Sequence, residues 1–282
     1  MISLPVPTTS ARSTFLRCAA NTTNGDLGHR LEQSAKHVML AAKTYLKASN
    51  SKTWNSLPHS IQTLPATDDE LRALYPRTMS ALGRAGRPVY DAIFNSAPNG
   101  VCPLCGQGKV FTLDHYLPRS VYAHFAILPI NLVPSCRDCN FAKRERHPSN
   151  PGDQTFHPYF DNVQGDRWLF CDVIVTGGVS LRYYVDPPNG WTKVQAQRVA
   201  RHFEVFRLAE SFTTYAANEL SSLKARLRIL FGRGGEKMVA DDLGLEATSS
   251  RQANLNSWKT AAYEALSQSK VFCGGGFEQI AM

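Results

Sequence analysis

The sequence predicts an α+β protein in which a small β-containing centre is flanked by mainly helical regions. Two observations predict the helices: apolar residues recur at three- and four-residue spacing over residues 28–49, and they do so again from residue 191 onward. A third observation predicts the centre. Residues 102–143 hold two Cys-x-x-Cys pairs with two short β-branched stretches between them.

The composition is that of a soluble globular protein. The chain has 282 residues, of which 43% are hydrophobic and 19% are charged, so it is long enough for one large domain or two smaller ones. The sequence has no run of about 18 apolar residues that would span a bilayer. We therefore expect a cytoplasmic protein with no membrane partner.

The net charge of +8 favours an anionic partner, because a basic surface attracts polyanions. Nucleic acid is the natural candidate for such a partner. Charge alone does not separate this interpretation from a basic protein that binds no polyanion.

Breaker residues divide the chain into five expected segments. A turn-forming Ala-Pro-Asn-Gly at 97–100 begins the central segment, and a Pro- and Asn-rich stretch at 148–152 ends it. The segments are a flexible leader (1–25), a helical N-terminal region (26–96), the central domain (97–150), a loop and β-hairpin (151–190) and a helical C-terminal region (191–282).

Local signals place the flanking elements. Thr67 followed by three acidic residues is typical of a helix start, and Pro76 and Pro88 are expected to divide the next stretch into short helices. Two β-branched and aromatic stretches flank a Thr-Gly-Gly turn at 176–178 and predict a hairpin. The glycines within 232–235 are expected to interrupt the C-terminal helices.

The two cysteine pairs predict a structural zinc site. Each pair lies on a tight turn that can supply two thiolates, and four thiolates complete a tetrahedral zinc without leaving a position for water. The predicted ligands are Cys102, Cys105, Cys136 and Cys139. The alternative is two unrelated pairs of buried cysteines. Zinc-bound thiolates would also imply a reducing compartment.

Between the pairs, the sequence predicts elements that a plain zinc module does not need. One strand is expected to end at Asp114 and His115, and a second to begin near Asn131. Asp138 is expected to cap a helix that continues to Pro148. The predicted order is cysteine turn, strand, long loop, strand, cysteine turn and helix.

This order carries a recognisable pattern: Cys-x-x-Cys, Leu-Asp-His-x-x-Pro-x-Ser, Asn-Leu-Val and Cys-x-x-Cys-Asn-x-x-Lys. The pattern strongly resembles the zinc-containing HNH endonucleases, whose active site is a ββα-metal finger. The resemblance is confined to the central stretch. One position departs from the family name, because Asn140 stands where the second His would be.

The resemblance implies a role for each matched residue. His115 resembles the general base that deprotonates the attacking water, and Asn131 resembles the residue that holds the loop and orients this base. Asp114 and Asn140 would bind Mg²⁺ or Mn²⁺ through oxygen. The implied activity is hydrolysis of phosphodiester bonds in DNA, with RNA also open, to give 5′-phosphate and 3′-hydroxyl ends.

Basic residues in the same stretch are expected to contact flanking phosphates. They are Arg119, Arg137, Lys143, Arg144 and Arg146. The alternative for those on the helix is a solvated face that binds nothing.

Two other functional hypotheses stay open. The finger could be the scaffold of a non-catalytic subunit that binds nucleic acid or assembles with other proteins. The nuclease could also be an effector of a bacterial anti-phage defence complex, silent until a regulatory partner such as an ATPase releases it. The large helical flanks motivate that second hypothesis.

Overall fold

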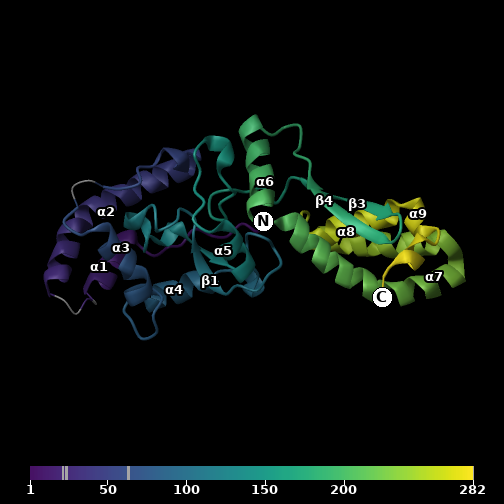
Figure 1. Cartoon of the computed structure of the whole chain (residues 1–282), viewed down its shortest axis with the longest axis horizontal. Coiled ribbons are helices and arrows are strands. Elements are labelled where there is room, and N and C mark those ends of the chain that lie inside the picture. The colour runs from purple at the N-terminus through teal and green to yellow at the C-terminus, as the bar shows by residue number, and fades with distance from the viewer. Residues whose placement is uncertain (21, 23–24, 62–63, 282) are drawn as a thin grey trace. The chain divides into compact units, whose positions relative to one another are not determined.

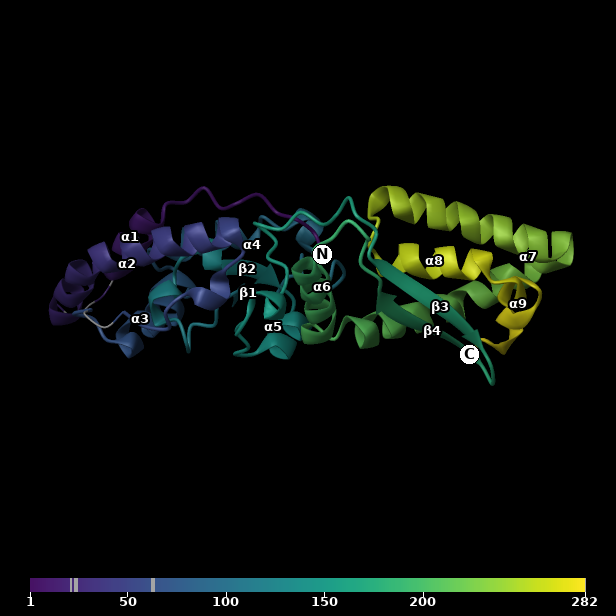
Figure 2. The ribbon, with the colours of Figure 1, turned by 90° about the horizontal axis from the view of Figure 1, so that it is seen from above.

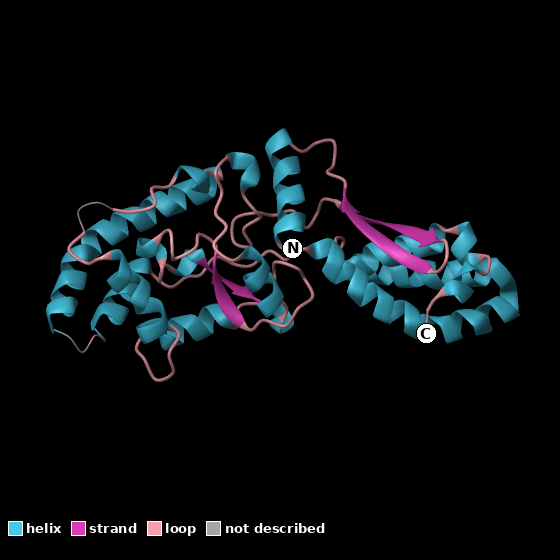
Figure 3. Ribbon diagram, in the orientation of Figure 1, coloured by secondary structure: helices cyan, strands magenta, loops and turns pink. Residues whose placement is uncertain are grey.

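The computed structural model describes residues 1–20, 22, 25–61 and 64–281. The chain is a mixed helix and sheet protein with two small antiparallel sheets, each of two strands (Figure 3). It divides into two compact units, Met1–Asn162 and Val163–Met282. The boundary between the units lies inside the expected loop and hairpin segment 151–190 and before the hairpin itself.

The first unit begins with helices. They are α1 (Ala11–Ala20), α2 (Gly25–Ser51), α3 (Asp68–Leu74) and α4 (Arg87–Phe94). Figures 1 and 2 show α1 lying beside α2. The start of α3 confirms the sequence prediction, because Thr67 accepts from the Glu70 backbone and the Glu70 side chain returns to the Thr67 backbone. Pro76 and Pro88 each lie in the first turn of a new helical segment.

The predicted central elements are present in the predicted order. Strand β1 (Thr112–His115) pairs antiparallel with β2 (Leu132–Ser135), and α5 (Arg137–Lys143) follows directly. The cap of α5 differs from the prediction: Cys136, not Asp138, is the N-cap, and its sulfur accepts from the Cys139 backbone. The helix also ends before Pro148, because Arg144 leaves the helical conformation, with φ of 52° and ψ of −129°.

One hydrophobic core joins the N-terminal helices to the central sheet. It contains Phe15 of α1, Leu31 of α2 and Leu71 of α3 together with Leu113 of β1 and Leu132 of β2, all at most 3% exposed. The helical region and the central segment are therefore packed as one body. Burial of this shared apolar surface fixes the helices against the sheet.

The expected flexible leader is ordered in the part that the structure describes. Met1 and Leu4 are buried, and α1 buries Phe15 and Cys18. The Ser- and Thr-rich composition of this stretch favours a mobile tail, but tertiary packing of its apolar residues overrides that preference. Residues 21, 23 and 24 of the leader lie outside the described residues.

The second unit packs helices on a β-hairpin. Strands β3 (Leu169–Val175) and β4 (Val179–Val185) confirm the predicted hairpin. The helices are α6 (Lys193–Val205), α7 (Leu208–Ala253), α8 (Trp258–Gln268) and α9 (Lys270–Cys273). Helix α7 is broken at Gly235, where φ is 64°, as the glycines predicted. Helix α8 packs against α7 and β3.

Among the helices of the described residues, none combines the length and the apolar character needed to cross a membrane.

Candidate active site and cysteine cluster

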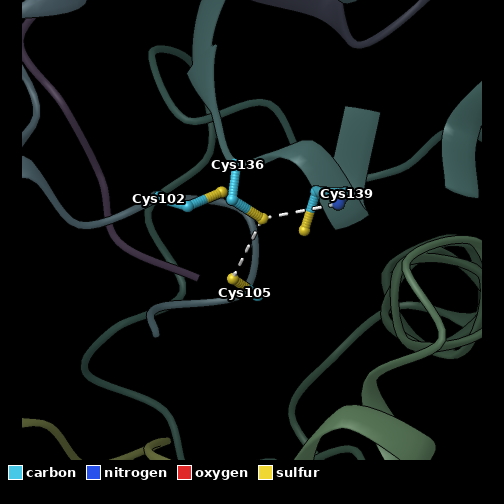
Figure 4. Close-up of side chains that lie close together, drawn as sticks. All are labelled: Cys102, Cys105, Cys136 and Cys139. Atoms are coloured by element: carbon cyan, nitrogen blue, oxygen red, sulfur yellow. Dashed lines mark hydrogen bonds between the residues drawn. The ribbon is translucent and has the colours of Figure 1, made fainter. Parts of the chain in front are cut away.

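The β1–β2 pairing brings the two cysteine pairs together. Cys102 and Cys105 lie on a turn before β1, closed by the bond from the Cys102 amide to the Gly108 carbonyl at 2.7 Å. Cys136 and Cys139 lie where β2 passes into α5. Figure 4 shows the four side chains gathered around a common point. Pairs that are 31 residues apart in the sequence thus become one cluster.

The geometry of the cluster suits a structural zinc ion. The four sulfur atoms lie within 4.8 Å of one another, and Cys105 Sγ is 3.9 Å from Cys136 Sγ. A tetrahedral zinc with bonds of about 2.3 Å places its sulfurs about 3.8 Å apart. Three of the four cysteines are at most 4% exposed, so a bound ion would be shielded from water.

Backbone groups around the sulfurs favour the thiolate form. The Gly108 amide donates to Cys105 Sγ at 3.3 Å, and the Cys139 amide donates to Cys136 Sγ at 3.4 Å. Gly108 is required here, because a Cβ atom would lie 2.8 Å from Cys136 Cβ and 2.9 Å from its sulfur. Hydrogen bonds from the other cysteines, chiefly Cys102, lower the pKa of Cys105. A cation would allow all four to ionise.

Asp114, at the end of β1, forms a buried ion pair with Lys143. Lys143 Nζ lies 3.1 Å from Asp114 Oδ2 and 3.3 Å from Oδ1, and it donates to the His115 carbonyl at 2.6 Å. Asp114 and Lys143 are 6% and 3% exposed. Burial raises the pKa of Asp114, and the charge of Lys143 opposes this shift. One side chain from α5 therefore fixes the Asp-His dipeptide.

His115 is held as a neutral imidazole with a defined tautomer. Its Nε2 lies 2.8 Å from the Ala126 carbonyl, which can only accept, so Nε2 carries the proton and Nδ1 keeps its lone pair. Burial lowers the pKa of His115 to about 3. The Tyr75 ring packs edge-on at 4.4 Å between centroids. A neutral imidazole held in this way can accept a proton at Nδ1.

Asn131 fastens the loop between the two strands. Its Nδ2 donates to the carbonyls of Leu117 and Phe125 at 3.0 and 3.2 Å, and its Oδ1 accepts from the Leu117 amide at 2.8 Å. Tyr45 of α2 also donates to Oδ1 at 3.1 Å. Phe125 precedes the residue whose carbonyl binds His115, so Asn131 acts on His115 through the loop and not by direct contact.

A surface pocket of about 320 Å³ brings three of the four predicted catalytic residues together. Asp114, His115 and Asn140 all line it, whereas Asn131 is fully buried beneath the loop and does not. None of the four cysteines lines this pocket. The central segment therefore contains two distinct sites, a cysteine cluster and a polar pocket.

The predicted phosphate contacts divide into three groups. Arg119 and Arg144 line the pocket. Arg137 does not line it and lies instead over the Phe111 ring at 3.7 Å, and Arg146 donates to the Ala142 carbonyl at 3.4 Å on the exposed surface. The prediction for Lys143 is wrong: its ammonium group is buried against Asp114 and is not available to a substrate phosphate.

Two charged residues of the pocket were missed by the sequence prediction. Arg72 comes from α3, and Glu145 follows α5. Arg72 lies on the polar side of a short amphipathic helix, so nothing in its local pattern distinguishes it from a solvated arginine. Glu145 sits in a run of charges for which the same is true.

Comparison with known proteins finds one full-length relative but no assigned chemistry. No family model matches the chain, and no solved structure matches it. Protein ea31 of Escherichia phage lambda is 25% identical over an alignment of 302 positions, which covers 98% of this chain and 100% of the phage protein. The similarity extends over both compact units, and the name of the phage protein states no activity.

Proposed function

We propose that this protein is a metal-dependent HNH endonuclease that hydrolyses phosphodiester bonds in DNA, with β1, β2 and α5 as its ββα-metal finger. The observation that carries the proposal is that Asp114, His115 and Asn140 line one pocket, separate from the four cysteines. A zinc held by the cysteines would stabilise the finger, and the pocket would carry out the reaction.

His115 acts as the general base in this proposal. Its Nδ1 is the nitrogen left to accept a proton, because Nε2 is engaged by the Ala126 carbonyl at 2.8 Å. Burial lowers the pKa of His115, which keeps the ring neutral at physiological pH. The same shift makes Nδ1 a weaker proton acceptor than an imidazole with a pKa near 7, so the proposed reaction also needs a bound cation that acidifies the attacking water. In the proposed step, Nδ1 takes a proton from the attacking water while the water oxygen forms a bond to phosphorus. The bond from phosphorus to the 3′ oxygen breaks, and that oxygen gains a proton from solvent, which leaves 5′-phosphate and 3′-hydroxyl ends.

The oxygen donors of Asp114 and Asn140 suit Mg²⁺ or Mn²⁺, which prefer carboxylate and amide oxygens. Lys143 occupies part of the Asp114 carboxylate, but a carboxylate has about four lone-pair sites, so capacity for a cation remains. A bound divalent ion would supply neutralisation of the charge on the scissile phosphate. Asn140 is exposed on α5 and lines the same pocket.

A plasmid-nicking assay tests this proposal. Purified protein with Mg²⁺ or Mn²⁺ is expected to convert supercoiled DNA to open-circular or linear forms, and His115→Ala is expected to abolish the conversion. His147→Ala is the matched control, because His147 is exposed and does not line the pocket. Full cleavage by the His115→Ala protein would contradict the assigned base.

One observation favours a non-catalytic alternative. Lys143 already neutralises Asp114 and also binds the His115 carbonyl, which is an arrangement that stabilises the fold without any ion in the pocket. In that case the protein is a zinc-stabilised subunit for nucleic-acid binding or assembly. Such a protein would bind DNA with no cleavage under any divalent ion, and Asp114→Asn would change its stability but not its DNA affinity.

The proposed role as an effector of an anti-phage defence complex, under control of a regulatory ATPase, remains a prediction. It is motivated by the size of the regions outside the finger, which include the whole unit Val163–Met282. Full-rate cleavage by the isolated protein would count against an obligatory partner.

A further inference from the structure

We propose that Arg72 of α3 is a substrate-binding residue, which together with Arg119 and Arg144 holds a phosphate of the polynucleotide backbone next to the bond that is cut. This inference rests on the proposed nuclease function and extends it. It makes the N-terminal helical region part of the active site, although none of its residues belongs to the pattern between the cysteine pairs.

Arg72 and Arg119 hold each other's segments in place. Arg72 Nη1 donates to the Ser120 carbonyl at 3.0 Å, and Arg119 Nη1 donates to the Arg72 carbonyl at 3.2 Å. The Arg119 guanidinium also lies over the Tyr75 ring at 5.6 Å. These reciprocal bonds fix the end of α3 against the loop after β1, so that both arginines border the pocket.

The pocket has the charge balance of a phosphate site. Three arginines line it, against the carboxylates of Asp114 and Glu145. Asp114 is already paired with Lys143 at 3.1 Å, so most of its charge is offset within the protein. The remaining excess is positive. Arginine is well suited to phosphate because its planar guanidinium donates two parallel hydrogen bonds to the oxygens.

Arg72 has both access and spare donors. Its side chain is 32% exposed, and its contacts with Ser120 and Asp69 use two of the five N–H groups of a guanidinium. The Asp69 partner is 92% exposed, with Arg72 Nη2 at 2.9 Å from Asp69 Oδ1. An ion pair with so exposed a carboxylate is readily exchanged for a phosphate.

The experiment measures binding in a cleavage-deficient background. Fluorescence anisotropy of a short labelled DNA duplex gives the Kd of the His115→Ala protein across salt concentrations of about 50 to 200 mM. Adding Arg72→Gln is expected to raise Kd about tenfold and to reduce the slope of log Kd against log salt by about one. Arg72→Lys is expected to keep the parent's salt slope and to bind DNA more tightly than Arg72→Gln does, because lysine keeps the positive charge. It should still bind more weakly than arginine, because an ammonium group cannot donate two parallel hydrogen bonds to a phosphate.

Two further variants separate substrate binding from a structural role. Arg77→Gln is the matched control, since Arg77 is exposed and does not line this pocket. Asp69→Asn is expected to lower Kd, because it releases Arg72 for the phosphate, whereas a purely structural Arg72 predicts no such gain. If Arg72→Gln and Arg77→Gln have the same Kd and the same salt slope, Arg72 is not a phosphate-binding residue. That result would leave the proposed nuclease function untouched. Absence of DNA binding by the His115→Ala protein itself would contradict the proposed function as well.

Discussion

The cysteine cluster and the polar pocket lie in the same short segment but are built in different ways. Each half of the cluster is a local turn, and a single β pairing joins the halves. The pocket draws on α3, the end of β1, the following loop and α5. The cluster is therefore a property of short sequence patterns, whereas the pocket is a property of tertiary packing.

The two sites also handle charge differently. In the cluster, four thiols meet at one point, and ionisation of all four would place four negative charges together, which a bound cation would balance. In the pocket, Lys143 supplies a built-in cation for Asp114. Both sites lie in the unit Met1–Asn162. The comparison therefore predicts that metal removal destabilises this unit through the cluster, whereas loss of Lys143 destabilises it through Asp114 without removing the metal.

The largest effect is expected from breaking the cluster. Cys136→Ser removes one thiolate ligand, and structural zinc contributes on the order of 10 kcal/mol to small metal-stabilised folds. We expect loss of bound zinc and loss of cooperative unfolding in the unit Met1–Asn162, measured by metal analysis and circular dichroism. Cys171→Ser, a buried thiol outside the cluster, should retain zinc. Equal zinc content in both variants would contradict the four-ligand site.

A smaller but still large effect is expected from breaking the ion pair beneath the pocket. Lys143→Met leaves a buried carboxylate unpaired, which typically costs about 3–5 kcal/mol of unfolding free energy. Burial raises the pKa of Asp114 in the folded protein, so the folded state binds this proton more tightly than the unfolded state. The stability of the variant should therefore fall as pH rises through the folded pKa.

Urea unfolding of Lys143→Met at several pH values measures this prediction. Lys47→Met on α2 is the control, because Lys47 is exposed. A loss of stability no larger than in the control, or one that does not grow with pH, would show that the pair contributes little.

The smallest effect is expected in the loop that joins the strands. His124 is 2% exposed, neither ring nitrogen has a hydrogen-bond partner among the described residues, and burial lowers its pKa to about 4. The unfolded chain binds this proton more tightly than the folded protein does. The folded protein therefore loses stability as pH falls from the pKa of His124 in the unfolded chain toward its folded pKa of about 4. Leucine does not titrate, so the unfolding free energy of His124→Leu minus that of the parent should change with pH. We expect this difference to be about 2 kcal/mol larger at pH 5 than at pH 7.

Thermal or urea unfolding of the two proteins at these pH values checks the His124 prediction. A difference that is independent of pH would mean that His124 does not titrate against folding.

Local patterns predicted most of the framework. The capping sequence at Thr67 and the glycine break at Gly235 are features of a few adjacent residues, and both are confirmed. The β1–β2–α5 order was also predictable, because strand periodicity and cysteine spacing are written in consecutive positions. The N-cap of α5 was not, since Cys136 and Asp138 both suit a helix start and only the backbone geometry decides.

Long-range contacts account for the rest. Lys143 was predicted to be a surface cation, because the sequence of a seven-residue helix does not reveal which face is buried. In the structure its side chain points to Asp114, which lies 29 residues earlier in the chain. Arg72 was missed because its link to the Ser120 carbonyl spans 48 residues. Such contacts depend on the shared core and leave no local pattern.

The central claim is that cutting and folding belong to different sites within residues 102–143. The most direct test is the initial rate of plasmid nicking by folded His115→Ala protein, compared with the parent at a temperature well below both Tm values. We predict that the rate falls by about 10²- to 10⁴-fold, the contribution of a general base, while zinc content stays unchanged. A rate within a few-fold of the parent, or zinc loss in the variant, would contradict the claim.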